Sequence, residues 1–327
     1  MPVTVNTVTG PISVDALGTT LMHEHLVIGF AGWESDTLHP GPSRNEMIAV
    51  CCDKIAQMQA VGIRSLVDPC PNDLGRDATL AAEVARRTGF NIVCATGMYK
   101  EEDGGAACWN FRGRFGSIVE TLSELFVREL TVGIGDTGIK AGIIKVGSGP
   151  HGISNHERAV LQAAALAAKA TGAPIMTHTD EGKHGDEQQA ILTALGVPPR
   201  QIVIGHSCGT TDHDYHLKIA RGGSYLGFDR FGINRLMPDE SRVQALTALI
   251  NKQMEKQLFV SQDTVWCWRG EHFPPHVLAA FDYNVYANPT HLHRTIFARM
   301  RELGVTQRQI DTLLIDNPRR FFAGEAF

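Results

Sequence analysis

The sequence predicts a (β/α)8 barrel, an α/β fold of the TIM type in which eight parallel strands alternate with helices. Short runs rich in Val, Ile and Leu alternate with longer amphipathic stretches, a pattern typical of repeated βα units around a parallel sheet. We count eight such runs, and barrels of this kind often use the whole of a chain this long as one domain. Because no linker or low-complexity tract interrupts residues 1–327, we expect a single domain.

The predicted strands are apolar runs that end in polar residues or turn signals. In chain order they are TTLMHEH (19–25), IRSLVDP (63–69), NIVCATG (91–97), AGIIKVG (141–147), APIMTHT (173–179), QIVIGH (201–206), SYLGFD (224–229) and QLFVSQD (257–263). Eight such strands favour closure into a barrel.

The segments between the strands have the length and amphipathic pattern of helices. They cover residues 44–61, 77–88, 117–132, 155–171, 184–195, 239–255 and 290–303. Gly62, Gly89 and Gly172 stand where a left-handed residue would end a helix before the next strand. Before the barrel, residues 3–13 predict a short hairpin. After it, VTQRQIDTLLIDNPRRFF predicts a short helix, a turn at Asn317 and Pro318, and a last helix that covers the barrel.

Composition limits the partners and the compartment. The formal net charge is −5 and no Lys/Arg block occurs, which argues against nucleic-acid binding and favours a small-molecule partner. The seven cysteines form no CxxC pair, which is typical of free thiols in a reducing compartment. Nowhere do about 18 uncharged apolar residues run together, and the first residues lack a signal-peptide pattern. We therefore expect a cytoplasmic protein with no membrane partner.

Polar residues with ligand chemistry stand at the ends of five predicted strands, where a parallel barrel places its active-site groups. They are His23, His25, Lys145, His178, His206 and Asp263. His23 and His25 should share one face of their strand, with Glu24 pointing away. A lone buried His is usually a hydrogen-bonded core residue, and a lone Asp is often a helix cap. Four histidines and an aspartate at one rim instead predict a metal centre, with more ligands than one tetrahedral ion needs.

Lys145 is the unusual member of this set, because an ammonium group beside two cations would be repelled. Burial and neighbouring cations should make its amine neutral, and a neutral amine can take up CO2 to form a carbamate. The carbamate would supply a carboxylate able to bridge two ions. The alternatives are that Lys145 extends to the rim or pairs with Asp263.

In order and spacing, HEH, GIIKVG, IMTHTD, VIGHSCG and VSQD resemble the phosphotriesterase family of the amidohydrolase superfamily. TGIKAGIIKVG, GAPIMTHT, YLGFDRFG and DNPRRFF resemble its phosphotriesterase-related and lactonase branch. The resemblance implies that His23, His25 and Asp263 hold the more buried of two divalent ions and that His178 and His206 hold the other. Lys145, N6-carboxylated, and a hydroxide would bridge them. The ions implied are zinc, cobalt, manganese or iron, and the family implies a homodimer.

The substrate side is predicted from fewer residues. Tyr99 and Arg230 resemble the lactonase pattern in which they orient the lactone, although Arg230 could instead pair with Asp229 at the rim. Trp266, Cys267 and Trp268 in TVWCWRG predict an apolar wall for an acyl chain, or else lid packing. The loop at residues 100–116 lacks the PFYF-type segment of better-known lactonases, so the pocket should differ there.

The expected function is a hydrolase that opens acyl-homoserine lactones, and so acts in quorum quenching, with weaker hydrolysis of organophosphate triesters. Asp263 would pass the proton of the hydroxide to the leaving oxygen. The alternative enzyme is a dedicated phosphotriesterase (aryldialkylphosphatase) or another carboxylic or phosphoric ester hydrolase. The alternative of another class is a non-catalytic metal-binding protein on the same fold.

Overall fold

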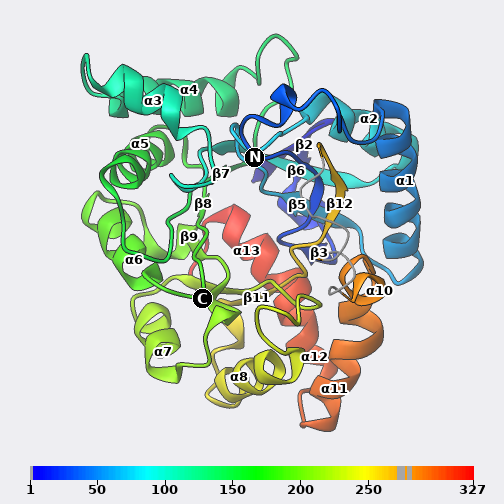
Figure 1. Cartoon of the computed structure of the whole chain (residues 1–327). Coiled ribbons are helices and arrows are strands. Elements are labelled where there is room, and N and C mark those ends of the chain that lie inside the picture. Colours follow the sequence, from blue (N-terminus) through cyan, green and yellow to red (C-terminus); the bar gives the residue numbers. More distant parts are fainter. Residues whose placement is uncertain (1–2, 271–276, 278–281) are drawn as a thin grey trace.

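Eight parallel strands form the centre of the protein. A computed structural model describes residues 3–270, 277 and 282–327. The strands are β3 (Thr20–Leu21), β5 (Ser65–Asp68), β6 (Asn91–Gly97), β7 (Ile143–Lys145), β8 (Ile175–Met176), β9 (Ile202–Ile204), β10 (Tyr225–Phe228) and β11 (Leu258–Val260). They pair in the order β11-β10-β9-β8-β7-β6-β5-β3 (Figure 1). The predicted eight-stranded barrel is confirmed.

Helices surround this sheet on the outside (Figure 1). They are α1 (Arg44–Ala60), α2 (Ala78–Thr88), α3 (Ala106–Gly113), α4 (Val119–Thr131), α5 (Asn155–Thr171), α6 (Gly185–Ala194), α7 (His213–Arg221), α8 (Asp239–Asn251), α10 (Tyr283–Tyr286) and α11 (Phe297–Glu302), which follows the π-helical turn η6 (Leu292–Ile296). Short 3-10 turns are η1 (Val14–Ala16), η2 (Trp33–Ser35), η3 (Pro199–Gln201), η4 (Ser207–Gly209) and η5 (Glu255–Gln257). Among the described residues, no helix has both the length and the apolar character needed to cross a membrane.

Local sequence explains where these helices begin and end. Ser43 and Ser154 open α1 and α5 with capping boxes, each paired with a glutamate three residues later. Gly89 and Gly172 end α2 and α5 in the left-handed conformation, as predicted. Gly62 also has a positive φ but follows α1 by two residues. The segment 100–116, treated as a loop in the sequence, contains the helix α3.

Alternation along the strands divides the apolar residues into two layers. In β6, Ile92 and Cys94 belong to the cluster that includes the helices, whereas Val93 and Ala95 belong to a second cluster. This second cluster fills the inside of the barrel with one or two residues from most strands. Its strand members are Val67, Val93, Ala95, Ile143, Met176, Val203, Tyr225 and Phe259.

The two ends of the chain pack against this inner layer. The predicted hairpin is confirmed as β1 (Thr4–Thr7) and β2 (Gly10–Ser13), which pair antiparallel. At the other end, α12 (Gln307–Asp311), the π-helical turn η7 (Thr312–Asp316) and α13 (Asn317–Ala323) follow one another without a break. Phe321 and Phe322 of α13 join the inner cluster, so the predicted cover over the barrel is confirmed.

The turn predicted at Asn317 and Pro318 is wrong. Both residues are helical, because Pro318 lies in the first turn of α13, where its missing N–H interrupts no bond within that helix. The Asn317 side chain donates to the carbonyls of Glu255 and Leu258, each at 2.7 Å. These bonds, and not a turn, explain why a polar residue is fully buried there.

The strand predicted at 19–25 is also wrong as a single strand. It breaks after Leu21 and resumes as β4 (His25–Ile28), which pairs with β12 (Val265–Trp268) and not with β5. The break lies at the seam of the barrel, between β3 and β11. Across this seam the Asp263 amide donates to the His23 carbonyl at 3.0 Å, and the His25 amide donates to the Thr264 carbonyl at 2.9 Å.

A buried ion pair fixes α4 against the strands. Arg76, after β5, donates to both carboxylate oxygens of Glu129 on α4 at 2.8 and 2.9 Å, and to the Ala95 carbonyl of β6 at 2.8 Å. Both side chains are at most about one-tenth exposed. Removing one partner would leave a buried charge without compensation.

We therefore predict that Glu129→Ala lowers the free energy of unfolding by about 3–5 kcal/mol, the usual cost of breaking a buried pair. Urea unfolding followed by circular dichroism measures the change. The matched control is Glu124→Ala on the exposed side of the same helix, expected within about 0.5 kcal/mol of the wild type. Equal losses in the two variants would contradict the assignment.

Candidate metal centre

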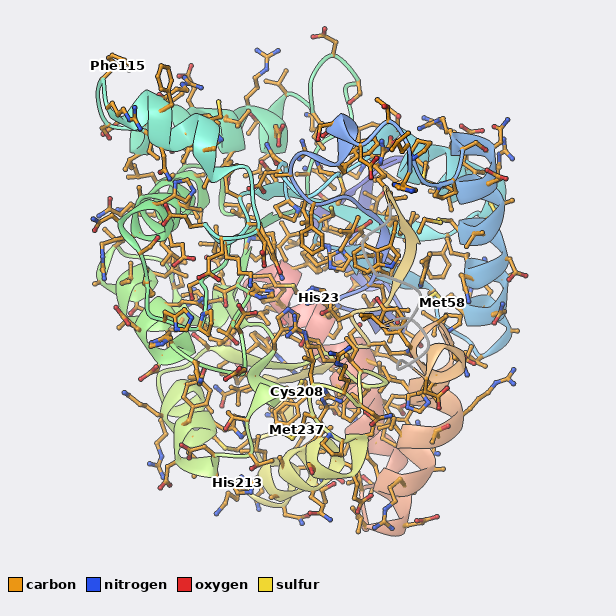
Figure 2. The ribbon with its side chains drawn as sticks, viewed as in Figure 1. His23, Met58, Phe115, Cys208, His213 and Met237 are labelled. Carbon is orange, nitrogen blue, oxygen red and sulfur yellow. The ribbon has the colours of Figure 1, made fainter. Side chains whose placement is uncertain are left out.

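The six predicted ligand residues meet at the end of the barrel interior. Lys145 and His178 each stand two residues after an inner-layer residue, Ile143 and Met176. Because strand residues two apart share a face, both side chains point inward above the apolar layer. Asp263 stands four residues after the inner-layer Phe259. Figure 2 shows His23 near the middle of the molecule, whereas His213 lies at its outer edge.

The distances define one compact cluster. Asp263 Oδ1 lies 3.3 Å from both His23 Nε2 and His25 Nε2, and the ligand atoms of these three residues lie within 4.8 Å of one another. Lys145 Nζ lies 3.3 Å from His23 Nε2. On the other side, His206 Nε2 lies 3.8 Å from Asp263 Oδ2, and the rings of His178 and His206 are 4.5 Å apart. This buried set of nitrogen and oxygen donors fits zinc and related divalent ions.

In three of the imidazoles, the ring nitrogen that faces away from the cluster contacts a buried carboxylate. Asp229 lies 2.9 Å from the Nδ1 atoms of both His23 and His206, and Asp68 lies 3.1 Å from Nδ1 of His25. These contacts leave Nε2 of each ring facing the cluster, which is how metal-binding histidines are commonly oriented. The sequence analysis did not assign these roles. The available signal was that Asp68 and Asp229 also end strands of the barrel.

The His178 ring has the opposite orientation to the other three, because its Nε2 and not its Nδ1 contacts a carboxylate. Its Nε2 lies 2.8 Å from Asp180 Oδ1 and 3.5 Å from the Tyr99 hydroxyl. Nδ1 is therefore the nitrogen left for an ion. Asp180 was also missed in the sequence analysis, although it stands only two residues after His178.

Arg230 does not pair with Asp229, so that alternative is wrong. Its Nε donates to Asp263 Oδ2 at 2.9 Å, while both oxygens of Asp229 are occupied by the imidazoles. Successive residues at the end of β10 point to opposite sides, which separates the two side chains. Arg230 consequently contacts the metal centre itself through Asp263.

Two candidate ligands have a strained backbone. His206 and Asp263 have φ values of 57° and 53°, in the left-handed region that costs a non-glycine residue about 1–3 kcal/mol. Side chains hold both conformations. The Asp229 carboxylate accepts from the His206 amide at 2.9 Å. Glu24 accepts from the amides on either side of Asp263, those of Gln262 and Thr264, at 2.8 and 3.2 Å.

Burial sets the protonation of the cluster. It lowers the pKa of His23 and of His178 to about 4, so both imidazoles are neutral and ready to bind a cation. Although burial opposes it, the neighbouring His23 and His206 rings and the Arg230 guanidinium hold the pKa of Asp263 well below its usual range. Asp263 is therefore a carboxylate. These three groups have the protonation states that metal ligands require. His25 differs: although burial opposes it, hydrogen bonds to Asp263 and Asp68 raise its pKa well above the usual value, so an ion would have to displace a proton from this ring.

Lys145 is 2% exposed, so it does not extend to the rim. Its amine contacts His23 Nε2 and donates to the Thr177 carbonyl at 3.2 Å. Neither contact is the pairing with Asp263 that was the alternative prediction. Burial lowers the pKa of Lys145 to about 8, while Asp229 and Asp263 oppose this change. The shift has the direction expected for a reactive amine, but with the protein groups alone Lys145 remains mostly protonated at neutral pH.

A cavity of about 210 Å³ opens above the cluster. Its floor includes the six candidate ligands, and Tyr99 and Arg230 stand beside them. Its walls are largely apolar and include Ile28, Phe30, Leu74, Ile233, Leu236, Val265 and Trp268. Of the predicted wall, Trp268 lines the cavity, whereas Trp266 and Cys267 are 5% exposed and pack in the core shared with α1. The prediction that Trp266 and Cys267 line the pocket is therefore wrong.

Comparisons with known proteins agree with this geometry. A model of the phosphotriesterase family matches residues 3–322. The phosphotriesterase homology protein of Mycobacterium tuberculosis is 34% identical over 97% of each chain. The organophosphorus hydrolase of Deinococcus radiodurans is 36% identical, with a TM-score of 0.93 over 98% of this chain and 97% of that one. A variant of a PTE-like lactonase from the same organism is 34% identical, with a TM-score of 0.91 over 97% and 99%.

We predict that zinc or cobalt added to chelator-treated protein raises its unfolding temperature, because a ligand that binds the native state alone stabilises it. At a concentration 100 times the dissociation constant, the stabilisation is about 2.7 kcal/mol. Differential scanning fluorimetry measures the shift. His23→Ala should reduce it strongly, and His213→Ala, on the outer edge, should not. A shift of the same size in both variants would contradict the site.

Proposed function

Because the chain belongs to the phosphotriesterase family, we propose that it is a metal-dependent hydrolase of ester bonds with two ions in its active site. We propose further that its preferred substrates are lactones of the acyl-homoserine type, and that it hydrolyses organophosphate triesters more weakly. The observation that carries the proposal is the buried cluster of nitrogen and oxygen donors under an apolar cavity.

The residues divide between two ions. His23, His25 and Asp263 would hold the more buried one, and His178 and His206 the other. Lys145 contacts His23 and lines the same cavity as His178 and His206, and as its N6-carbamate it would be a ligand of both ions. Zinc is the first candidate, and the same donors accept cobalt, manganese or iron. When bound, two such ions lower the pKa of a water molecule and polarise the carbonyl or phosphoryl oxygen under attack.

Asp263 would transfer the proton, and Arg230 would hold Asp263 in position. Oδ1 of Asp263 faces the two histidines, and Oδ2 accepts from Arg230, so the carboxylate is held at both atoms. Asp263 would take the proton of the attacking water and deliver it to the leaving oxygen. Arg230 keeps the carboxylate in place during both transfers.

Tyr99 orients the substrate. Burial raises the pKa of Tyr99 well above its usual value, so the phenol remains a hydrogen-bond donor at any physiological pH. It lines the cavity next to His178 and can donate to the ester oxygen. The apolar walls, with Trp268 among them, would hold an acyl chain and exclude water.

The largely apolar lining of the cavity, beside a few polar groups, supports lactones over triesters, because it suits a substrate that carries an acyl chain. The similar PTE-like lactonase supports the same choice. A dedicated phosphotriesterase is the second candidate, supported by the similar organophosphorus hydrolase. A non-catalytic metal-binding protein is disfavoured, because each expected ligand residue is present and directed at the cluster.

We predict that protein loaded with zinc or cobalt in bicarbonate has a higher kcat/KM for long-chain acyl-homoserine lactones than for paraoxon-like triesters. Steady-state assays of both substrate classes on one preparation measure the ratio. Chelator-treated protein is the control and should be inactive with both. A higher kcat/KM for the triester would support the second candidate, and no activity in fully loaded protein would support the non-catalytic alternative.

We also predict that Asp263→Asn lowers kcat by about 100-fold or more, the usual contribution of a general acid–base group. The fold should persist, because the amide is nearly isosteric with the carboxylate. Circular dichroism and metal analysis accompany the kinetics. The control is Asp214→Asn on the exposed side of α7, expected to leave kcat unchanged. Full activity of metal-loaded Asp263→Asn would exclude the proton-transfer role.

A further inference from the structure

The carboxylate behind His178 belongs to a chain of charges that reaches the segment after β6. Asp180 Oδ1 accepts from His178 Nε2, and Asp180 Oδ2 accepts from Lys100 Nζ at 2.6 Å. Lys100 also contacts Asp103 at 2.8 Å. Both oxygens of Asp180 are thus bound by donors within the protein. Asp180 therefore acts on an ion through His178, and not as a ligand of its own.

Lys100 is unusual for a lysine at the mouth of a barrel, because it is only 8% exposed. A buried ammonium is costly unless it is paired, and the two aspartates provide the pairing. Carboxylates also contact the outer nitrogens of His23, His25 and His206, but within the described part of the chain Asp180 is the only one of these histidine partners that is itself hydrogen-bonded to a lysine. This arrangement distinguishes the second ion's side of the site.

The backbone fixes the place of Lys100. Asp73, after β5, accepts from the amides of Tyr99 and Gly105 at 2.9 and 2.8 Å, and the Gly104 amide donates to the Lys100 carbonyl at 3.0 Å. Residues 99–105 are therefore held as a unit at the mouth of the barrel. The ammonium of Lys100 is presented to Asp180 by this unit.

We propose that Asp180 is a positioning residue for the second metal ion, and that Lys100 locks it in place. The carboxylate fixes the ring and tautomer of His178 so that Nδ1 faces the ion, and it increases the donor strength of that nitrogen. Lys100 keeps the carboxylate from rotating away. The segment 100–105 thereby controls how tightly the second ion is held. This inference rests on the proposed two-ion site.

The test compares four variants with the wild type, all loaded with cobalt in bicarbonate. They are Asp180→Asn, Lys100→Met, Lys100→Arg and the control Lys183→Met. Lys183 is the matched control because it is an exposed lysine in the loop that carries Asp180, and it pairs with Glu181. Competition against a graded series of chelators measures the dissociation constant of each ion. Urea unfolding of the metal-free proteins reports any general loss of structure.

We expect Asp180→Asn to raise the dissociation constant of the second ion by about 10–100-fold, the usual effect of losing such a partner. Lys100→Met should act in the same direction, and Lys100→Arg should restore the wild-type value because it keeps the cation. The first ion and the control variant should remain unchanged. Asp180→Asn and Lys100→Met each break a largely buried ion pair, so both should lower the metal-free stability. Such a general loss does not account for weakening that is confined to the second ion.

Three results would overturn the inference. A wild-type protein that binds fewer than two ions defeats the two-ion site and this proposal together. Two ions held equally tightly in Asp180→Asn and in the wild type defeat the positioning role alone and leave the proposed function intact. Equal weakening of both ions, with a matching loss of metal-free stability, assigns Asp180 and Lys100 a structural role instead.

Discussion

The structure of the site depends on how the barrel closes between β3 and β11. At this seam, residues 23–25 and 261–264 are joined by two backbone hydrogen bonds and by the Glu24 carboxylate, which also accepts from the Ser261 hydroxyl at 2.8 Å. Burial raises the pKa of Glu24 to about 7, and its hydrogen bonds oppose this rise. The side chain between the two histidines thus closes the barrel. In doing so it places His23, His25 and Asp263 within reach of one ion.

The second constraint is the cost of burying so many polar groups. The four histidines are at most 4% exposed, and unpaired polar groups in such surroundings are strongly unfavourable. The outer carboxylates reduce this cost by accepting from the ring nitrogen that faces away from the cluster. Asp229 does this for two rings at once, and its contact with the His206 amide also holds the left-handed turn at that residue. The same carboxylates therefore orient the histidine rings and reduce the free-energy cost of burying them.

Much of the fold and of the candidate site could be predicted from the sequence, because apolar runs recur along the chain and several of them end in residues able to bind a metal. The six candidate ligand residues, which the structure brings together, were predicted in this way. The break after Leu21 could not be, since the apolar run continues through it and only the pairing with β12 reveals the change of partner. Likewise, the partners of Arg230 and His25 lie 33 and 43 residues away, at distances that no local pattern encodes. Sequence periodicity shows which way a side chain points, but not what it meets.

One atom, Nε2 of His178, contacts both a residue that orients a candidate metal ligand and a residue that lines the substrate cavity. Nε2 of His178 faces both Asp180, which is tied to Lys100, and the hydroxyl of Tyr99. Tyr99 and Lys100 are neighbours in the chain, and Asp73 holds the segment that contains them through the amides of Tyr99 and Gly105. A change in the segment that shapes the cavity would therefore also shift the support of a ligand ring. In the proposed two-ion site, substrate preference and retention of the second ion would consequently be linked, because one short segment supplies both the Tyr99 phenol that lines the cavity and the Lys100 ammonium behind Asp180.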